Sequence, residues 1–224
     1  MKRTVSVLLG VVLLGCQPLA WADDPLPPPQ RTLPGGLTVN SIDELDILPA
    51  AKEVLRENVR LMKEQKLVPA AEGRLPDFDA IEAHYRARGK PLSEVTAAGK
   101  IGFAPAGLDA TPLRGLADAA IPGGVRRGTV WSGVARLFRH PELGIVILEE
   151  TDLRNGGGAM FTREMINADV NGAPAMLLSK QSSSGRSESR LMWFVDGMLY
   201  ELRTPGVDDR SRDALLATAR ALSR

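Results

Sequence analysis

The side chains that most often carry chemistry are few and widely separated in this sequence. Its histidines, His84 and His140, have no second histidine or cysteine at metal-ligand spacing. His84 lies in a charged stretch with a helical pattern and His140 in a turn before Pro141, so we expect surface or capping roles for both. Neither a Gly-x-Ser-x-Gly elbow nor a P-loop is present. The sequence therefore predicts no catalytic residue, no metal site and no cofactor.

Two short motifs could bind ions, but each has a simpler explanation. Glu149, Glu150 and Asp152 stand together at the end of a predicted strand, and carboxylate oxygens are hard ligands for cations. The group lacks the fixed spacing of a calcium loop, which favours a solvated strand end. The run Gly156-Gly157-Gly158 could cradle an anion through its backbone amides. No Lys-Ser or Lys-Thr follows this run, so a flexible hairpin loop is the better interpretation.

The N-terminal residues are typical of a bacterial secretory signal. A basic start, Met1-Lys2-Arg3, precedes an apolar run from Val5 to Leu14 that is too short to span a bilayer. We therefore expect a protein of the periplasm or, if lipidated, one anchored to the outer membrane.

The fate of the single cysteine depends on how this signal is processed. Leu13-Leu14-Gly15-Cys16 has the form of a lipobox, in which Cys16 is lipidated and becomes the mature N-terminus. Ala20-Trp21-Ala22 is instead a small-x-small site, and cleavage there discards Cys16. Both readings stay open, with simple cleavage slightly favoured because Leu14 is not small.

Charge and hydropathy limit the classes of partner. The chain has 28 basic and 27 acidic residues, and removing Lys2 and Arg3 leaves 26 against 27, a net charge of −1. Nothing electrostatic points to nucleic acid. No second apolar stretch approaches transmembrane length. Contact with a membrane is thus expected only through a lipid anchor at Cys16 or through a partner.

The residue composition and the hydrophobic pattern change along the chain, and these changes divide it into successive predicted segments. Ser41-Ile42-Asp43-Glu44 fits a capping box, and Pro49 suits the first turn of a helix that runs to about Lys66. A second, short helix is expected over 77–88, followed by Gly-, Ala- and Pro-rich loops. We predict a signal peptide (1–22), a Pro-rich tether (23–40), a helical and loop segment (41–128) and a sheet with a C-terminal helix (129–224).

The second half of the chain predicts strands separated by turns. Asn171-Gly172 and Asp196-Gly197 are strong hairpin signals, because both central residues of a type I′ turn need positive φ. Asp208 or Asp209 can cap a final helix that ends near Leu222. The predicted strands cover 129–138, 143–151, 159–170, 174–180, 188–195 and 198–204.

The two turns also predict register, since cross-strand partners in a hairpin have residue numbers with a constant sum. Around Asp196-Gly197 this places Val195 opposite Met198, Trp193 opposite Tyr200 and Leu191 opposite Leu202, on a wholly apolar face. Around Asn171-Gly172 the partners are Val170 with Ala173, Ala168 with Ala175 and Ile166 with Leu177, and the opposite face sets Arg163 beside Lys180.

Together these patterns predict an α+β fold: an antiparallel β-meander of about six strands covered by helices, with an N-terminal helical segment. The like-charge pair Arg163 and Lys180 should be solvated or met by an acidic partner. With Trp193 and Tyr200, these residues make up the surface at which we expect a partner or ligand.

The run from Leu191 to Leu202, with its Leu-x-Trp strand, Gly-containing turn and Tyr-x-Leu strand, is similar to the end of a known family. It resembles the extracytoplasmic domain of unknown function at the C-terminus of some bacterial anti-sigma factors, as does the hairpin Val170-Asn171-Gly172-Ala173 upstream. The likeness covers roughly 129–222 and implies a curved sheet with helices, distantly like periplasmic lipoprotein carriers. The chain lacks that family's transmembrane helix and sigma-binding part, so the resemblance implies an envelope binding or sensing module rather than an anti-sigma factor.

We therefore expect a non-enzymatic envelope protein that binds a protein partner or an apolar ligand. One alternative is an envelope hydrolase with a dispersed site. Another is a lipid or lipoprotein carrier, which would need one large apolar cavity. Its lining would come from Val134, Leu137, Ile145, Ile147, Trp193 and Tyr200.

Overall fold

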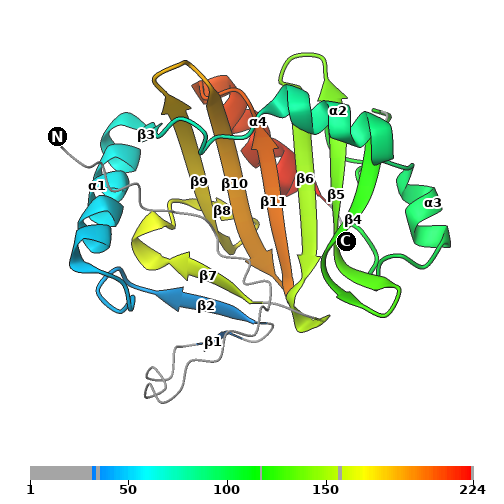
Figure 1. Ribbon diagram of the computed structural model, residues 1–224, viewed down its shortest axis with the longest axis horizontal. Helices are drawn as coiled ribbons and strands as arrows, with labels where there is room; N and C mark the ends of the chain where they lie inside the picture. The colour runs from blue at the N-terminus through cyan, green and yellow to red at the C-terminus, as the bar shows by residue number, and fades with distance from the viewer. Residues whose placement is uncertain (1–31, 34–35, 117, 156–157, 223–224) are drawn as a thin grey trace.

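The computed structural model describes residues 32–33, 36–116, 118–155 and 158–222 (Figure 1). The predicted signal peptide with Cys16, most of the Pro-rich tether, and Gly156 and Gly157 lie outside the described residues. Within the described part, no helix is both long and apolar enough to cross a membrane.

A large, mostly antiparallel sheet is the centre of the molecule. It has eight strands, with seven in the order β3-β9-β10-β11-β6-β5-β4 and β8 paired to one end of β9. The sheet is therefore larger than the predicted six-stranded meander. Its strands are β3 (Val68–Ala70), β4 (Asp118–Arg127), β5 (Val130–His140), β6 (Gly144–Asp152), β8 (Ala168–Val170), β9 (Ala173–Ser182), β10 (Ser187–Val195) and β11 (Met198–Thr204).

The pairs predicted around Asp196-Gly197 are confirmed, and so are the two nearest Asn171-Gly172, whereas Ile166 is not paired with Leu177. Val195 pairs with Met198, Trp193 with Tyr200 and Leu191 with Leu202. Asn171 and Asp196 take positive φ values of 52° and 48°, as type I′ turns require. At the other turn, Val170 pairs with Ala173 and Ala168 with Ala175.

The expected continuous strand over 159–170 is wrong, because the chain enters the hairpin with β9 only at Ala168. It divides into β7 (Ala159–Thr162), a 3-10 turn (Arg163–Met165) and β8. Asn167 ends the ladder by exchanging side-chain hydrogen bonds with the backbone of Leu177. Arg163 is consequently not beside Lys180.

Strand β7 belongs to a small second sheet, in the order β1-β2-β7. β7 pairs in parallel with β2 (Leu37–Asn40), which also pairs with β1 (Thr32–Leu33). This pairing joins segments 122 residues apart, as Thr38 opposite Met160 illustrates. The region expected to be loops likewise contains β4, an edge strand of the large sheet.

Four helices surround the sheet: α1 (Pro49–Gln65), α2 (Phe78–Arg88), α3 (Leu92–Ala97) and α4 (Asp209–Ala221). Asp77 and Asp208 cap α2 and α4 through their carboxylates, as the sequence indicates. Ser41 and Glu44 form the reciprocal bonds of a capping box, but these close an isolated turn. The helix itself starts only at Pro49.

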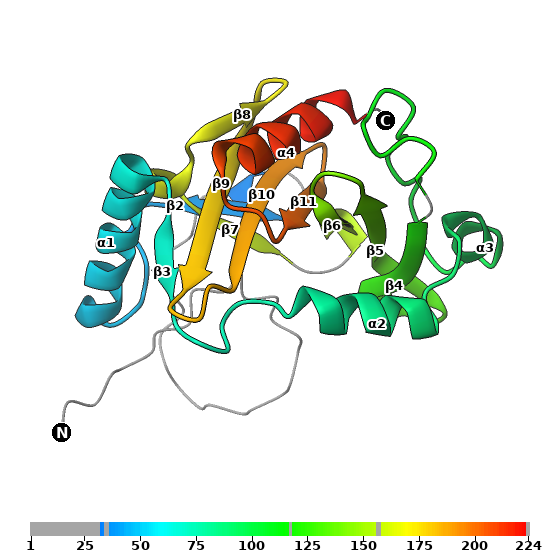
Figure 2. The ribbon, with the colours of Figure 1, turned by 90° about the horizontal axis from the view of Figure 1, so that it is seen from above.

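The view from above shows α4 on one side of the large sheet and α2 on the other (Figure 2). Buried apolar side chains form a core on each of these two faces. On one face, α4 packs through Leu215 on Leu191, Trp193 and their neighbours. We call this the α4 face. On the other, α1 with the small sheet covers Met192 and Leu199, and α2 covers Leu137 and Ile147. We call this the α1–α2 face.

Candidate functional site

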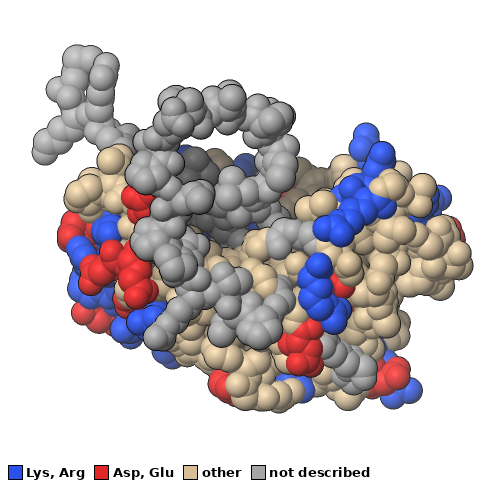
Figure 3. Space-filling view, turned by 90° about the horizontal axis from the view of Figure 1, so that it is seen from below, with Lys and Arg blue, Asp and Glu red and all other residues tan. Residues whose placement is uncertain are grey.

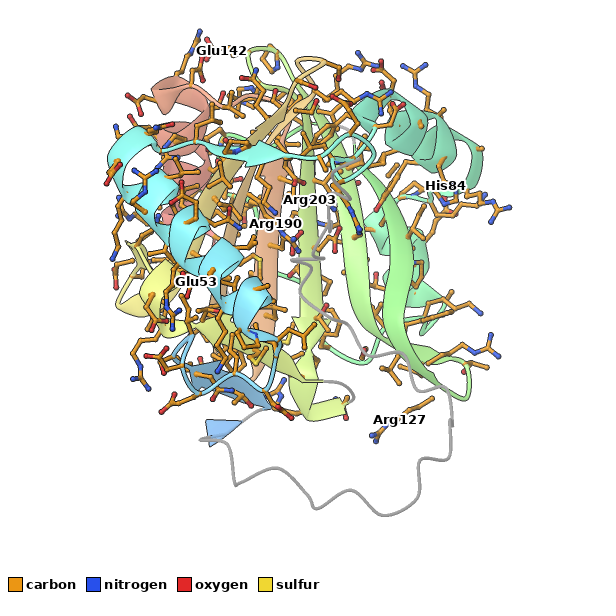
Figure 4. The ribbon with its side chains drawn as sticks, turned by 60° about the vertical axis from the view of Figure 1, so that its left-hand side comes forward. Glu53, His84, Arg127, Glu142, Arg190 and Arg203 are labelled. Atoms are coloured by element: carbon orange, nitrogen blue, oxygen red, sulfur yellow. The ribbon has the colours of Figure 1, made fainter. Side chains whose placement is uncertain are left out.

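Charged side chains occupy the middle of the α1–α2 face, between the two apolar clusters. Figure 4 shows Arg190 and Arg203 at this place, on strands that lie between α1 and α2. Because alternate residues of a strand point to the same face, several ionisable groups of neighbouring strands gather here. We call this group the central charged patch, and it consists of Glu149 on β6, Lys180 on β9, Glu188 and Arg190 on β10, and Glu201 and Arg203 on β11.

The register places like charges directly opposite each other in this patch. Arg190 is the cross-strand partner of Arg203, and Glu201 is that of Glu149. Such pairs are unfavourable by themselves. Only Lys180 and Glu188 are directly opposed with opposite charge.

Diagonal ion pairs compensate the like-charge pairs. Arg190 bonds Glu201 across the diagonal, and Arg203 Nε lies 2.6 Å from Glu188 Oε1. Arg203 Nη1 is also 3.4 Å from Glu149 Oε1. Its Nε also lies 3.4 Å from Glu201 Oε1 on the same strand. Arg203 thereby contacts three carboxylates, from β6, β10 and β11, and is the centre of the network.

The patch is half-buried rather than sealed. The side chains of Arg190, Arg203 and Glu149 keep 23%, 20% and 37% of their exposure, whereas Glu188 and Glu201 are nearly buried. The Arg190 Nε atom is buried and has no hydrogen-bond partner among the described residues. The network therefore has spare hydrogen-bonding capacity next to groups that solvent can reach.

Burial and neighbouring charges shift the protonation equilibria of the patch. Burial, and then the charge of Glu201, raise the pKa of Glu149 above its ordinary value, although Arg203 and Arg190 oppose this. Burial also lowers the pKa of Lys180, against the charge of Glu188. At the edge of the patch, burial and the charge of Glu149 raise the pKa of Tyr85 to about 12.

A network of this kind is poorly explained by stability alone. Half-buried ion pairs lose much of their Coulomb energy to desolvation, and apolar residues of similar size often stabilise a protein as well or better. The same sheet face is apolar on both sides of the patch. Shifted pKa values and unused hydrogen-bonding groups are features that mark binding and catalytic sites. The arrangement is suited to a polar ligand that offers both donors and acceptors.

Of the residues predicted at a partner surface, only Lys180 lies in this patch. Trp193 and Tyr200 stack with ring centroids 5.1 Å apart, but on the α4 face, and are 3% and 4% exposed. They belong to the core. Arg163 is exposed elsewhere and pairs with Glu44 at 3.7 Å. Cys16 lies outside the described residues.

The three acidic residues predicted to stand together at the end of β6, Glu149, Glu150 and Asp152, do not lie on one face of the sheet. Only Glu149 faces the patch. Glu150 is buried on the other face, where it bonds the Ala106 amide and lies 3.8 Å from Arg136. Asp152 is buried and bonded by Arg154 and Asn155. In the described part of the chain, no three metal-ligating side chains come together.

The two histidines have the ordinary roles expected of them. His84 is exposed on α2. The His140 Nδ1 atom accepts hydrogen bonds from the amides of Glu142 and Leu143, and so closes the turn before β6.

The residues predicted to line a carrier cavity are not brought together. Trp193 and Tyr200 lie under α4, Leu137, Ile145 and Ile147 under α2, and Val134 near α3. A hollow of about 410 Å³ does occur on the outer side of α2, but Asp79, Glu82 and Arg86 line it. Its charge makes it unsuited to an acyl chain.

Comparison with protein-family models, with curated proteins and with solved structures found no match. The fold and the site thus define the protein only as an α+β protein with a half-buried charged patch on one face of its sheet. Sequence reasoning missed this patch, although the register predicted for Asp196-Gly197 already set Arg190 opposite Arg203. The sequence interpretation used only the residues on the apolar face of that hairpin and left the residues on its polar face out.

Proposed function

We propose that the protein is an exported, non-enzymatic binding module of the cell envelope, and that a protein partner binds at the central charged patch. The observation that supports this most is the set of partly exposed ion pairs formed by Arg190, Glu201 and Arg203 in the middle of an apolar sheet face. An extended segment of a partner has peptide N–H and C=O groups for the carboxylates and guanidinium groups. The secretory pattern at the N-terminus supports the location.

An apolar ligand is the weaker form of this proposal. The residues that would have lined its cavity are packed in separate clusters, and their burial places them in filled cores. A polar partner also suits the charge balance, because the patch combines Lys180, Arg190 and Arg203 with equal numbers of glutamates.

The test compares proteins captured from an envelope extract by the full chain and by a patch variant. The variant Arg190→Gln with Glu201→Gln removes one ion pair without changing net charge. The control, Arg56→Gln with Glu53→Gln, removes an exposed ion pair of α1 with the same chemistry. We expect at least one partner to be lost with the patch variant and kept by the control. Equal capture of every partner by both variants would contradict the proposal.

One observation favours the hydrolase alternative. Glu149 and Glu201 are cross-strand neighbours, and the pKa of Glu149 is raised, which suits a proton donor paired with a carboxylate. Glycosidic, ester and peptide substrates can be screened with the wild-type protein and with Glu149→Gln. Hydrolysis that Glu149→Gln abolishes would establish the enzyme.

Anchoring through Cys16 is a separate question with a direct measurement. Mass spectrometry of the mature N-terminus distinguishes a diacylglyceryl-modified Cys16 from a free Asp23. The first result makes the protein a lipoprotein, and the second makes it a protein without an anchor of this kind.

A further inference from the structure

The hairpin of β4 and β5 continues beyond the strand that should support it. β5 pairs with β6 from His140 only as far as Gly133, whereas it pairs with β4 on to Val130 opposite Arg127. Residues 124–131 therefore form a ribbon of two strands, and among the described residues only a single bridge, between Ile101 and Trp131, joins the other side of β5 here. We call these residues the basic ribbon. Figure 4 shows Arg127 at its end, away from the helices.

Specific contacts hold this ribbon in place. An isolated two-stranded ribbon is marginally stable in water. Here the Val125 amide donates to Ser132 Oγ at 2.9 Å, across a bulge in β4, and the Trp131 amide donates to the Lys100 carbonyl at 2.8 Å. The Arg126 guanidinium lies over the Trp131 ring, 5.7 Å from its centroid. The ribbon is thus an ordered feature, and its side chains have defined positions.

The charges of the ribbon are not neutralised by the protein. Arg126, Arg127 and Lys100 are exposed, and no carboxylate pairs with them in the part of the chain that the structure describes. Arginines of α1 and α2, such as Arg60 and Arg86, do have carboxylate partners. In the view from below, Lys and Arg atoms lie on both sides of the molecule (Figure 3). On the left they are mixed with Asp and Glu atoms, whereas at the upper right few acidic atoms accompany them.

Apolar groups accompany these cations. Val125 keeps 40% of its exposure, and Trp131 is half-buried beneath Arg126. Tryptophan and arginine side by side are typical of segments at the headgroup level of a membrane, where an amphipathic ring and a cation are both accommodated. The cations and the partly exposed apolar groups are spread over both strands of the ribbon and the neighbouring Lys100. A broad surface can contact more of them at once than a small anion can.

We propose that the basic ribbon binds the surface of a bilayer that contains anionic phospholipids. Because neighbouring strand residues point to opposite faces, the end of the ribbon enters the headgroup region with Arg126 and Trp131 on one side and Arg127 on the other. Both guanidinium groups bind lipid phosphates there, Lys100 adds to the attraction, and Val125 with Trp131 contacts the headgroup region. The ribbon and the central charged patch are built from different residues. A partner bound at the patch and a membrane bound at the ribbon can therefore be separated by mutation.

Sedimentation with lipid vesicles tests the proposal. The processed protein is mixed with vesicles of phosphatidylcholine alone or with added phosphatidylglycerol, at low and at high salt. We expect binding to the anionic vesicles to exceed binding to the neutral ones and to fall with salt. Because each cation near an anionic surface strengthens binding about fivefold, Arg126→Gln with Arg127→Gln should weaken it by at least about tenfold.

The control is Arg56→Gln with Arg60→Gln, which removes the same charge from exposed positions on α1. This variant should bind anionic vesicles like the wild type, and the far-UV circular dichroism of both variants should match it. Comparing lipid compositions cancels any contribution of a lipid anchor. Equal binding to neutral and anionic vesicles overturns the proposal. So does equal loss in both variants, or loss of an acidic protein partner in the ribbon variant with vesicle binding unchanged.

Discussion

The buried pair of Arg136 and Glu150 shows most clearly how single residues fix this structure. Arg136 is 2% exposed and Glu150 is fully buried. Glu150 accepts the Ala106 amide at 2.7 Å, and Arg136 donates to the Ala106 carbonyl at 3.4 Å. The pair therefore attaches the loop around Ala106 to the sheet, and Glu150 is the carboxylate that acts most strongly on Arg136.

Arg136→Met should lower the free energy of unfolding by about 3–5 kcal/mol, because it removes one partner of a buried ion pair while the Glu150 carboxylate stays buried. Adding Glu150→Gln should recover a large part of this loss, since no buried charge then remains. Urea unfolding of both variants measures the difference. If the double variant were as unstable as Arg136→Met, packing rather than charge would explain the effect.

Glu149 gives a prediction for pH dependence. Its pKa is raised above the ordinary 4.5, so the folded state binds this proton more tightly than the unfolded state. Stability from this group is complete below the unfolded pKa and is lost as pH rises through the folded pKa. Glu149→Gln should thus be more stable than the wild type at neutral pH, by no more than about 1 kcal/mol because solvent screens a side chain that is 37% exposed.

The measurement is the thermal unfolding of Glu149→Gln and of the wild type from below the unfolded pKa of the carboxyl up to neutral pH. The advantage of the variant should vanish below about pH 4.5, where the carboxyl is protonated in both states. If Glu149→Gln were more stable than the wild type by the same amount at every pH, the difference would come from the changed contact with Arg203 and not from protonation of Glu149.

At the scale of elements, the turns Asn171-Gly172 and Asp196-Gly197 determine the register of two hairpins, and they are also the reason why these hairpins could be predicted. Gly172 and Gly197 both have positive φ, but a Cβ at Gly172 would meet nothing within 4 Å. At Gly197 it would lie 2.6 Å from Arg154 Cδ. Displacing Arg154 would also disturb the buried carboxylate of Asp152 that it bonds.

Gly172→Ala should therefore cost about 1 kcal/mol of unfolding free energy through backbone conformation alone. Gly197→Ala should cost at least about 1 kcal/mol more, because it also weakens hydrogen bonds to a buried carboxylate. Chemical denaturation of the two variants provides the comparison. Equal losses would show that Arg154 moves aside at no cost.

The elements that sequence reasoning missed lack such local signals. β4 contains Pro122, Gly123 and Gly124, which are residues typical of loops, and it is an edge strand with a bulge at these positions. β7 pairs with β2, far away in the sequence, and no local pattern indicates a partner at that distance. The hairpins β8–β9 and β10–β11 were predictable because Asn171-Gly172 and Asp196-Gly197 set the register next to these turns directly.

At the scale of the whole molecule, the central strands couple the two cores. Successive residues of β10 and β11 face opposite sides: Leu191 lies under α4 and Met192 under α1, and Tyr200 and Leu199 are divided in the same way. The charged patch lies on the same strands. It could be predicted only in outline, because the positions of α1 and α2, which leave it open, depend on contacts that the sequence does not show.

This coupling predicts that the molecule unfolds as one unit. Leu215→Ala on the α4 face and Leu55→Ala on the α1–α2 face each create a cavity in a buried cluster, and each should cost about 2–5 kcal/mol. In either variant, the near-UV signal of the stacked Trp193 and Tyr200 pair and the far-UV signal should have the same midpoint in urea. If Leu55→Ala lost helical signal while the aromatic signal persisted, α1 and the small sheet would be an independently unfolding unit.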